Sequence, residues 1–321
     1  MEFSVSVIIP VYNGEQFIEK AILSALNQPE VTEVIVVDDG STDDTQIILE
    51  ELKSNNPKIK VFHHKNNQNK GRSASRNLGI EKATENYIAF LDADDFYLEN
   101  RFQADKEKLA LDTNIDGIYN AVGYHFYRDA TVEERKSFEL NMVKKAIKPT
   151  ELFKALFSGE LGHFHVNGLT VKKKVFNKSG LFNERLKVGE DTELFWRMAL
   201  KCQLKTGLLN TPVAIRGVHD NNVFNRKDLY KTYTIKMYET LFFWMDKNGI
   251  KKNYADETLK IIWLIKYKQD IGLIQAIFYW NFLFLNNMKF LFSTLSIKYF
   301  PIVRLRQQLF PFLFINRNPP A

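Results

Sequence analysis

Cysteine is nearly absent from the chain: among 321 residues, only Cys202 carries a thiol. One thiol excludes an internal disulfide framework and offers no thiolate cluster for zinc. This usage is typical of a reducing cytoplasm, and the simplest interpretation of Cys202 is a core residue. The sequence also shows no internal repeat and no low-complexity linker, so repeat architectures are not expected.

A secretory signal is missing as well. Glu2 stands where a signal peptide has basic residues, and the run SVSVIIPVY is too short and too rich in β-branched residues for a signal or spanning helix. We therefore expect a cytosolic protein. The composition does supply a core: 45% of the residues are hydrophobic and 26% are charged, enough for one large domain or two smaller ones.

Acidic residues are scarce at the C-terminal end of the sequence. Residues 251–321 contain ten Lys or Arg and three Asp or Glu, a net charge of +7. Because the whole chain carries +6, the remainder sums to −1. The excess positive charge therefore belongs to the tail.

The first hundred residues alternate between two hydrophobic periods. Short apolar or β-branched runs predict strands: SVSVIIPV, EVIVVDD, IKVFHH and NYIAFLD. Amphipathic patterns at residues 15–27, 43–55 and 73–83 predict helices between them. This alternation predicts βαβ units and a mostly parallel, doubly wound α/β sheet flanked by helices. The segment GSTDD, residues 40–44, supplies capping side chains for the second helix.

The pattern is less regular beyond Leu98. From Asn225 the composition shifts toward helix with many aromatic residues and lysines. The elements expected between these two points are helices at 101–111, 150–157 and 192–201, strands at 115–124, 166–172, 204–209 and 213–218, and a polar surface excursion at 128–148.

Carboxylates gather where predicted strands end. Ligands of a doubly wound sheet bind beyond these ends, which here carry Asp38 and Asp39 and the segment FLDADDF, residues 90–96. Three aspartates within four positions repel one another, so we expect a positive partner. Mg²⁺ or Mn²⁺ would fit, because hard cations prefer carboxylate oxygens and often share them with substrate phosphates. A lone D-x-D is a weak signal, and a solvated turn that caps the next helix is the alternative.

Four segments taken together are much more specific. SVIIPVYNGE, VIVVDDGSTDDT, NKGRSASRNLGI and YIAFLDADD follow one another at suitable spacing. In this order they resemble the landmarks of family 2 glycosyltransferases, nucleotide-sugar enzymes of the GT-A fold. A fifth segment, LKVGEDTELFWRM, resembles the Glu-Asp segment with which that family opens a helix. The resemblance covers roughly residues 4–220 and says little about the tail.

The resemblance implies a domain organisation and a nucleotide-binding set. A GT-A catalytic domain would span residues 1–225, with the donor side in about 1–100 and the acceptor side in about 101–225, before a basic, aromatic-rich helical extension at 226–321. Asp39 would bind the base, commonly uracil. One of Arg72 and Arg76 would contact the base or the diphosphate, unless both lie on an exposed helix face. The other implied nucleotide-binding residues are Pro10, Val11, Tyr12, Asn13, Asp92 and Ala93.

The resemblance also implies the chemistry. Asp94 is the implied direct ligand of Mn²⁺ or Mg²⁺, and His219, in AIRGVHDNN, would reach the metal or the diphosphate. Asp191 is the implied base that takes the proton of the acceptor hydroxyl, and Glu190 would orient the acceptor. Asp95 would either belong to the outer shell of the metal or cap the following helix, and the cap is the role we favour. Transfer would then invert the anomeric carbon in one step, without a covalent sugar on the enzyme.

Several of these residues have a simpler interpretation. Glu190 and Asp191 could serve only as helix caps, and His219 could be an ordinary hydrogen-bonded loop residue. His163 and His165, in GHFHVNG, alternate as residues on a strand do and could line the acceptor pocket. No third soft ligand has the spacing of a zinc site with them.

The tail has two interpretations that can coexist. Residues 271–297 contain one charge, Lys289, and are long enough to consider as a membrane span, but Gln and Asn side chains interrupt them. Cations interleaved with aromatic residues, as in KIIWLIKYK, predict instead peripheral contact of residues 251–321 with anionic lipid at the inner face of the cell membrane. The other interpretation is a helical subdomain that packs on the catalytic domain or on a second subunit of a homo-oligomer. Nucleic acid is not expected, because long apolar runs dilute the charges.

The function implied is transfer of a hexose-type sugar from a nucleotide donor, expected to be UDP-linked, to a hydroxyl of a glycan. We expect a lipid-linked acceptor in the synthesis of a bacterial capsule, O-antigen or related surface glycan. A haloacid-dehalogenase-like phosphatase also places D-x-D after an apolar strand, but it leaves PVYNGE and DDGSTDD unexplained. A non-catalytic nucleotide-binding scaffold of a glycan-assembly complex is the second alternative.

Overall fold

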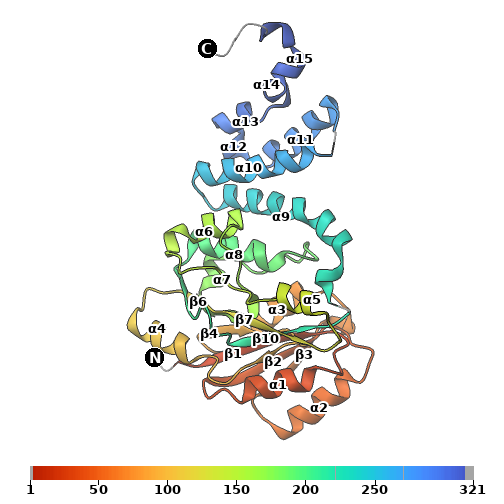
Figure 1. Cartoon of the computed structure of the whole chain (residues 1–321), viewed down its shortest axis with the longest axis vertical. Helices are drawn as coiled ribbons and strands as arrows, with labels where there is room; N and C mark the ends of the chain where they lie inside the picture. Colours follow the sequence, from red (N-terminus) through yellow and green to blue (C-terminus); the bar gives the residue numbers. More distant parts are fainter. Residues whose placement is uncertain (1–2, 221, 270, 315–321) are drawn as a thin grey trace. The chain divides into compact units, whose positions relative to one another are not determined.

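The computed structural model of the chain describes residues 3–220, 222–269 and 271–314. The chain divides into two compact units between Leu229 and Tyr230, four residues after the boundary expected from the sequence. Figure 1 traces the elements of each unit. The first unit holds all five landmark segments, so it is the unit that positions the site.

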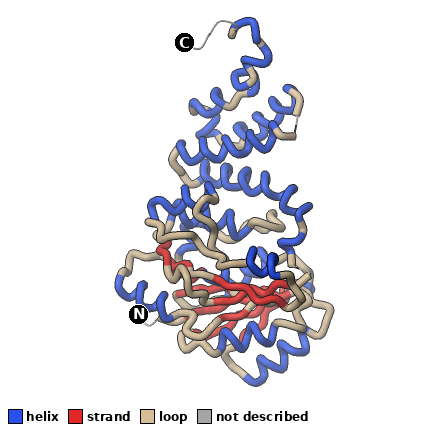
Figure 2. The backbone as a smooth tube through the Cα atoms, in the orientation of Figure 1, coloured by secondary structure: helices blue, strands red, loops and turns tan. Residues whose placement is uncertain are grey.

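A seven-stranded sheet, red in Figure 2, forms the centre of the first unit in the order β3-β2-β1-β4-β8-β6-β9. Its first four strands are mutually parallel, β8 is antiparallel to β4 and β6, and β9 is parallel to β6. The mostly parallel sheet predicted from the sequence is thus confirmed. The strands are β1 (Val5–Val11), β2 (Val31–Asp38), β3 (Ile59–His63), β4 (Tyr87–Phe90), β6 (Gly117–Tyr119), β8 (Leu169–Lys172) and β9 (Leu204–Thr206).

Helices cover both faces of this sheet, as the buried run VSVIIPV of β1 requires. Val7 and Ile9 of β1 belong to the same core cluster as the buried face of α1. Ile8 points the other way, where a Cβ at Gly79 of α3 would lie 2.4 Å from its Cγ2. The helices and short turns of this unit are α1 (Ile18–Leu26), α2 (Thr45–Asn55), η1 (Lys65–Asn67), α3 (Arg72–Lys82), α4 (Gln103–Leu111), α5 (Val132–Ser137), α6 (Pro149–Ser158), η2 (Val166–Gly168), α7 (Val175–Ser179), α8 (Glu190–Lys201) and η3 (Val223–Asn225).

A small second sheet in the order β5-β10-β7 lies in the same unit. It consists of β5 (Phe96–Tyr97), β10 (Ala214–Val218) and β7 (Val122–Phe126). The single strand expected at 115–124 is therefore wrong, because the chain leaves one sheet for the other after β6. At the crossing, the Asn120 amide donates to the Gly168 carbonyl at 3.0 Å and the Ala121 amide to the Leu208 carbonyl at 2.8 Å.

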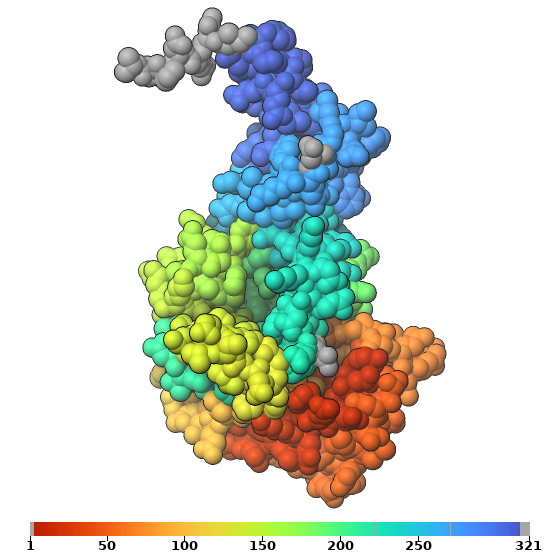
Figure 3. Space-filling model, turned by 45° about the vertical axis from the view of Figure 1, so that its right-hand side comes forward, coloured from red at the N-terminus to blue at the C-terminus, as the bar shows by residue number. Residues whose placement is uncertain are grey.

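One other local expectation needs correction. The excursion at 128–148, yellow in Figure 3, exposes α5 but buries Met142, Val143 and Ile147, so it is not wholly a surface segment. At the start of α2, the N-cap residue Asp44 makes no side-chain cap. Asp43, in the same GSTDD segment, accepts hydrogen bonds from the amide and hydroxyl of Thr45 at 3.1 and 2.5 Å, so the segment supplies a capping side chain as the sequence predicts. Cys202 is buried, as expected.

The second unit is helical, as the composition of the tail predicts. Its core gathers large aromatic side chains, including the fully buried Phe242, Trp263 and Phe284. Within the described ranges, no helix is long and apolar enough to cross a membrane. The elements are α9 (Lys227–Lys247), which begins before the boundary, α10 (Lys252–Tyr267), α11 (Leu273–Leu285), α12 (Met288–Leu291), α13 (Thr294–Lys298), α14 (Pro301–Arg304), α15 (Arg306–Leu309) and η4 (Pro311–Leu313).

Candidate functional site

The candidate site lies at the edge of the large sheet where its parallel strands end. β2, β1 and β4 are neighbours and run in the same direction. The loops that follow them therefore meet at one edge, as in other doubly wound sheets. These loops carry Tyr12, Asp39 and Asp92, so three of the sequence landmarks converge there.

The loop after β1 offers one exposed aromatic side chain. Pro10 and Val11 are buried strand residues, so only their backbone can face a ligand. Tyr12 is 51% exposed and available to cover a base. Asn13 adopts a φ of 51°, a conformation that Asn tolerates well, and its side-chain oxygen accepts a hydrogen bond from the Thr42 amide at 2.8 Å. This bond ties the loop after β1 to the loop after β2.

Asp39 links the second landmark to the third. Its two carboxylate oxygens accept hydrogen bonds from the backbone amides of Lys70 and Gly71, at 2.7 and 2.8 Å. Gly71 lies directly before α3 with a φ of 87°, where a side chain would be strained. Asp39 therefore holds the start of α3 beside the end of β2.

A chain of alternating charges crosses the middle of the site. Arg76 lies 2.6 Å from Asp92 and 3.0 Å from Glu190, and Arg72 lies 2.5 Å from Glu190. Arg76 is 1% exposed, so the interpretation as an exposed helix face is wrong for this residue. The side chain of Arg72 is 34% exposed, which makes Arg72 the arginine able to reach a ligand.

This arrangement keeps Asp92 ionised. Burial alone would raise the pKa of Asp92, but the positive charges of Arg76 and Arg72 and the hydrogen bond from Arg76 lower it below its usual range. The pKa of Arg76 is raised, because the carboxylates of Asp92 and Glu190 outweigh its own burial. Asp92 and Glu190 thus lie at opposite ends of one buried guanidinium.

Asp94 meets His219 on the other side of the loop. His219 Nε2 lies 2.9 Å from Asp94 Oδ2, and the side-chain amide of Asn222 donates to the same oxygen at 3.0 Å. The His219 ring stacks on Phe17 with ring centroids 5.1 Å apart, which fixes its orientation. The fold thus places Asp94, the implied metal ligand, beside His219, which was expected to reach the metal or the diphosphate.

Asp95 does not cap the following helix. It is 2% exposed, and its carboxylate accepts hydrogen bonds from the Gly217 amide, at 2.7 Å, and from the Asn167 side chain. The next helix, α4, begins at Gln103, well beyond its reach. Burial, with the neighbouring carboxylates of Asp94 and Asp92, raises the pKa of Asp95 well above its usual value. Asp95 therefore anchors the loop to β10.

The residues fit a divalent cation at Asp94. Asp94 and His219 are partly exposed, at 29% and 19%, and present an oxygen and a ring nitrogen side by side, a donor pair that suits Mn²⁺ and tolerates Mg²⁺. Ligand atoms of Asp92, Asp95 and His165 also lie within 4.8 Å of one another. Asp95 fits a cation less well, because N–H donors already occupy both of its oxygens.

The candidate base begins α8. Gly189 precedes the helix with a φ of 75°, and Glu190 and Asp191 are its first two residues. Burial would raise the pKa of Asp191, but the positive charges of Arg72 and Arg76 lower it overall. An ionised carboxylate at this position can accept a proton. The Thr192 amide occupies one oxygen at 2.7 Å, so the second oxygen remains for an acceptor.

His165 lies beside Asp92, with ligand atoms of the two residues within 4.8 Å of one another. It is 7% exposed, and its Nδ1 accepts a hydrogen bond from the Asn167 amide at 3.4 Å. Burial and the positive charge of Arg216 lower the pKa of His165 to about 4, against the opposite effects of Asp92 and Asp191. The imidazole is therefore neutral near pH 7, with its Nε2 as the donor. Burial lowers the pKa of His163 as well, against the opposite effect of the Asp191 charge.

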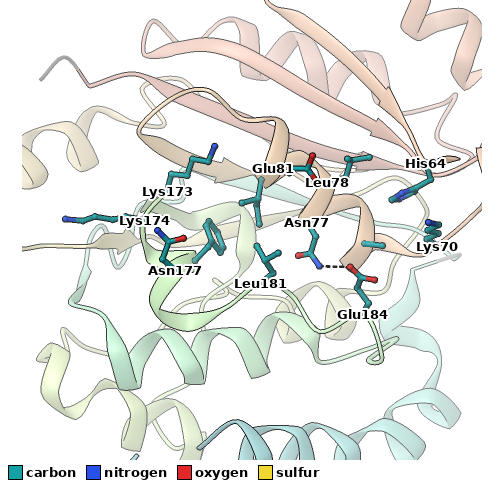
Figure 4. Close-up of a pocket in the computed structure, with 13 residues that line it drawn as sticks. His64, Lys70, Asn77, Leu78, Glu81, Lys173, Lys174, Asn177, Leu181 and Glu184 are labelled. Atoms are coloured by element: carbon teal, nitrogen blue, oxygen red, sulfur yellow. Dashed lines mark hydrogen bonds between the residues drawn. The ribbon is translucent and has the colours of Figure 1, made fainter. Parts of the chain in front are cut away.

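A cavity of about 830 Å³ runs along α3 beside the site. Figure 4 shows Lys173 and Lys174 at one end and His64 and Lys70 at the other, with the Asn77–Glu184 hydrogen bond between them. None of the predicted site residues lines this cavity. Asp39, which lies 3.5 Å from His64, connects this cavity to the site.

Sequence reasoning missed two asparagines. Asn167 accepts from the Asp92 amide at 3.2 Å and donates to Asp95, so it holds the D-A-D loop from both ends. Asn222 contacts both Asp94 and His219. Their positions, two residues after His165 and three after His219, were the available signal, since side chains so close to candidate histidines share their loops.

The sequence profile described as Glycosyl transferase family 2 matches residues 6–178 of the chain, which is more than half of it. The chain belongs to this family. It is 34% identical over 237 residues to an uncharacterised glycosyltransferase of Rickettsia bellii, covering 70% of this chain and 30% of the relative. It is 31% identical over 205 residues to the Bacillus subtilis minor teichoic acid biosynthesis protein GgaA, and the match covers 61% of this chain and 43% of that protein.

A third relative of this family 2 chain has a more specific name. The Campylobacter jejuni GalNAc(5)-diNAcBac-PP-undecaprenol beta-1,3-glucosyltransferase is 29% identical over 194 residues, covering 58% of this chain and 57% of the relative. The chain thus spans 30 to 57% of the length of these three relatives. The S. aureus TarS 1–349 structure with UDP-GlcNAc aligns with a TM-score of 0.62 and 15% identity, covering 95% of this chain and 92% of TarS 1–349. That likeness shows the GT-A fold.

Proposed function

We propose that the chain transfers a sugar from a UDP-linked donor to a hydroxyl of a lipid-linked glycan, with inversion, in bacterial surface-glycan synthesis. The family supports glycosyl transfer. The names of two relatives refer to teichoic acid and to an undecaprenol-linked glycan, and TarS was solved with UDP-GlcNAc. An acceptor of this kind would bring the protein to the inner face of the cell membrane.

One observation carries the proposal: the buried Arg76 joins Asp92 of the donor loop to Glu190 at the start of α8. The donor side and the base, Asp191, therefore share one rigid connection. A ribose or diphosphate at Asp92 and a hydroxyl at Asp191 would be held in a fixed relation, which is how positioning accelerates transfer.

In the proposed reaction, Asp39 and Tyr12 hold the uracil base of the nucleotide, and Arg72 approaches its diphosphate. A divalent cation at Asp94 and His219 would offset the charge that develops on the departing UDP. The free oxygen of Asp191 takes the proton of the acceptor hydroxyl as that oxygen attacks the anomeric carbon, and the bond to UDP breaks on the opposite face.

A screen of nucleotide sugars with and without Mn²⁺, read as UDP release in the presence of a bacterial lipid-linked glycan extract, tests the proposal. We expect Asp191→Asn to lower the transfer rate about 10²- to 10⁴-fold while UDP binding is retained. Asp94→Ala should weaken Mn²⁺-dependent UDP binding, and Asp129→Asn, in an exposed loop, is the matched control.

Other results would contradict specific parts of the proposal. A normal rate with Asp191→Asn would refute the assignment of the base. UDP binding without transfer from any donor would favour the scaffold, and phosphate release from simple phosphoesters would favour a phosphatase. If no nucleoside diphosphate binds with either metal supplied, the donor site itself is refuted.

A further inference from the structure

An exposed apolar stripe runs along α11 in the second unit. Ile274, Phe278 and Leu285 are 70, 71 and 57% exposed, and Phe282 is 46% exposed. At 100° per residue, the first three lie within about 40° of one another around the helix axis, and Phe282 borders them. Ala276 and Leu283, on the opposite side of the helix, are fully buried. The stripe is therefore the outer face of a helix whose inner face belongs to the core.

Exposed apolar residues continue beyond α11, in the segment coloured blue in Figure 3. Met288, the first residue of α12, and Phe292, directly after that helix, are 53 and 82% exposed, and Ile297 in α13 is 67% exposed. Near the end of the described chain, Phe312 and Leu313 are 67% exposed each. Soluble proteins rarely expose so many large apolar side chains in one segment unless that segment contacts a partner.

The charge of the same segment is of one sign. Residues 271–314 contain four basic residues, Lys289, Lys298, Arg304 and Arg306, and no acidic residue. Three of these cations line a cavity of about 540 Å³, together with Tyr267, Leu305 and Gln308. Asp256 pairs with Lys298 at 2.6 Å, which leaves two guanidinium groups in excess at this cavity. An anionic group of the size of a phosphate would be attracted there.

We propose that residues 271–314 dock on a bilayer that contains anionic phospholipid, with the α11 stripe in the acyl–headgroup boundary and a lipid phosphate at Arg304 and Arg306. Apolar side chains next to cations are the chemistry of a segment that lies in the plane of a membrane interface. This surface deepens the proposed function, because a lipid-linked acceptor would be reached from the same membrane. Its own test does not depend on transfer.

A second copy of the chain is the competing occupant, and the charge argues against it. Two such surfaces placed face to face would bring eight cations together with no carboxylate from either segment between them, and like charges in an interface are costly. An anionic bilayer removes this penalty and accepts the apolar side chains at the same time.

Co-sedimentation of the full chain with vesicles tests the proposal. We expect binding to vesicles of equal phosphatidylglycerol and phosphatidylcholine, little binding to phosphatidylcholine alone, and a loss of binding at high salt. Phe278→Ser with Phe292→Ser should weaken partitioning about tenfold or more. Arg304→Gln with Arg306→Gln should weaken it selectively on the anionic vesicles, by about tenfold.

Matched controls come from the first unit. Ile47→Ser with Leu111→Ser removes two apolar side chains of 67 and 87% exposure, and Lys53→Gln with Lys82→Gln removes two exposed cations; both variants should bind vesicles as the original chain does. Equal partitioning of the phenylalanine variant would overturn the proposal. Self-association that is lost in that variant, without vesicle binding, would assign the surface to a second copy instead. UDP binding of every variant, measured separately, keeps this outcome distinct from failure of the donor site.

Discussion

Arg76 shows how a single buried residue can organise two landmarks. Its guanidinium, 1% exposed, contacts Asp92 from the loop after β4 and Glu190 from the start of α8. Arginine suits this place because two of its nitrogens can address two carboxylates at once, whereas an ammonium is a point charge. The Arg76 Nε has no hydrogen-bond partner among the described residues, so the contacts to the two carboxylates carry the role of this residue.

We therefore expect Arg76→Ala to destabilise the fold by about 3–5 kcal/mol, because it leaves two buried carboxylates without their shared cation. Arg76→Lys should recover only part of this loss. Urea unfolding measures the loss of stability in both variants. Arg72→Ala, which removes a side chain that is 34% exposed, is the control and should cost less. Equal unfolding midpoints for Arg76→Ala and the original chain would show that the charge chain does not stabilise the fold.

At the scale of elements, Glu33 clamps the strand ends that lie opposite the site. This 2% exposed residue of β2 accepts hydrogen bonds from the Ser6 hydroxyl of β1 at 2.5 Å and the Thr84 amide at 2.6 Å, and it pairs with Lys60 of β3. Burial opposes its charge, but the hydrogen bonds from Lys60, Ser6 and Thr84 outweigh burial and lower the pKa of Glu33.

This lowered pKa predicts an acid-sensitive contribution to stability. Since the folded-state pKa lies below the unfolded value of about 4.3, the ionised carboxylate stabilises the fold above that pH. The contribution is lost as the pH falls through the folded-state pKa. Glu33→Gln should cost about 1–3 kcal/mol at pH 7 and flatten the pH dependence below about 5. The free energy of unfolding, measured with urea between pH 7 and 3.5, checks this, with exposed Glu81→Gln as the control. If the pH dependence of this free energy ran parallel in Glu33→Gln and the original chain, the prediction would be contradicted.

The elements near the N-terminus were predictable because their signals are local. The four parallel strands and the helices between them each show the right period within about ten residues, and the strand ends then place Asp39 and Asp92 at one edge. The strand expected at 115–124 failed for the opposite reason. Its second half pairs with β10, about ninety residues later in the chain, and periodicity carries no information about which sheet a run joins.

The candidate site was predictable in its residue types but not in its connections. Asp95 contacts Gly217 across 122 positions, and Arg76 contacts Glu190 across 114. Only such long-range pairing distinguishes a loop anchor from a helix cap, or a buried arginine from one that can reach a ligand. Arg72 and Arg76, four residues apart on α3, could therefore not be told apart before their burial was known.

At the scale of the whole molecule, the two units differ in composition as well as in fold. The first contains every landmark of the family and both sheets. The second contains helices, an aromatic core and the basic surface of residues 271–314, with four cations and no acid. Each unit has its own buried core, so a ligand of one need not stabilise the other.

This division predicts two unfolding transitions in scanning calorimetry of the full chain. UDP with Mn²⁺, at about 100 times its dissociation constant, should stabilise the first unit by about 2.7 kcal/mol. Only one transition should then move to higher temperature, because every predicted donor-site residue lies before Leu229. Mn²⁺ alone and UDP alone are the controls and should shift it less. A single transition that moves as a whole would show that the units unfold together, and the boundary at Tyr230 would then mark a change in packing rather than in stability.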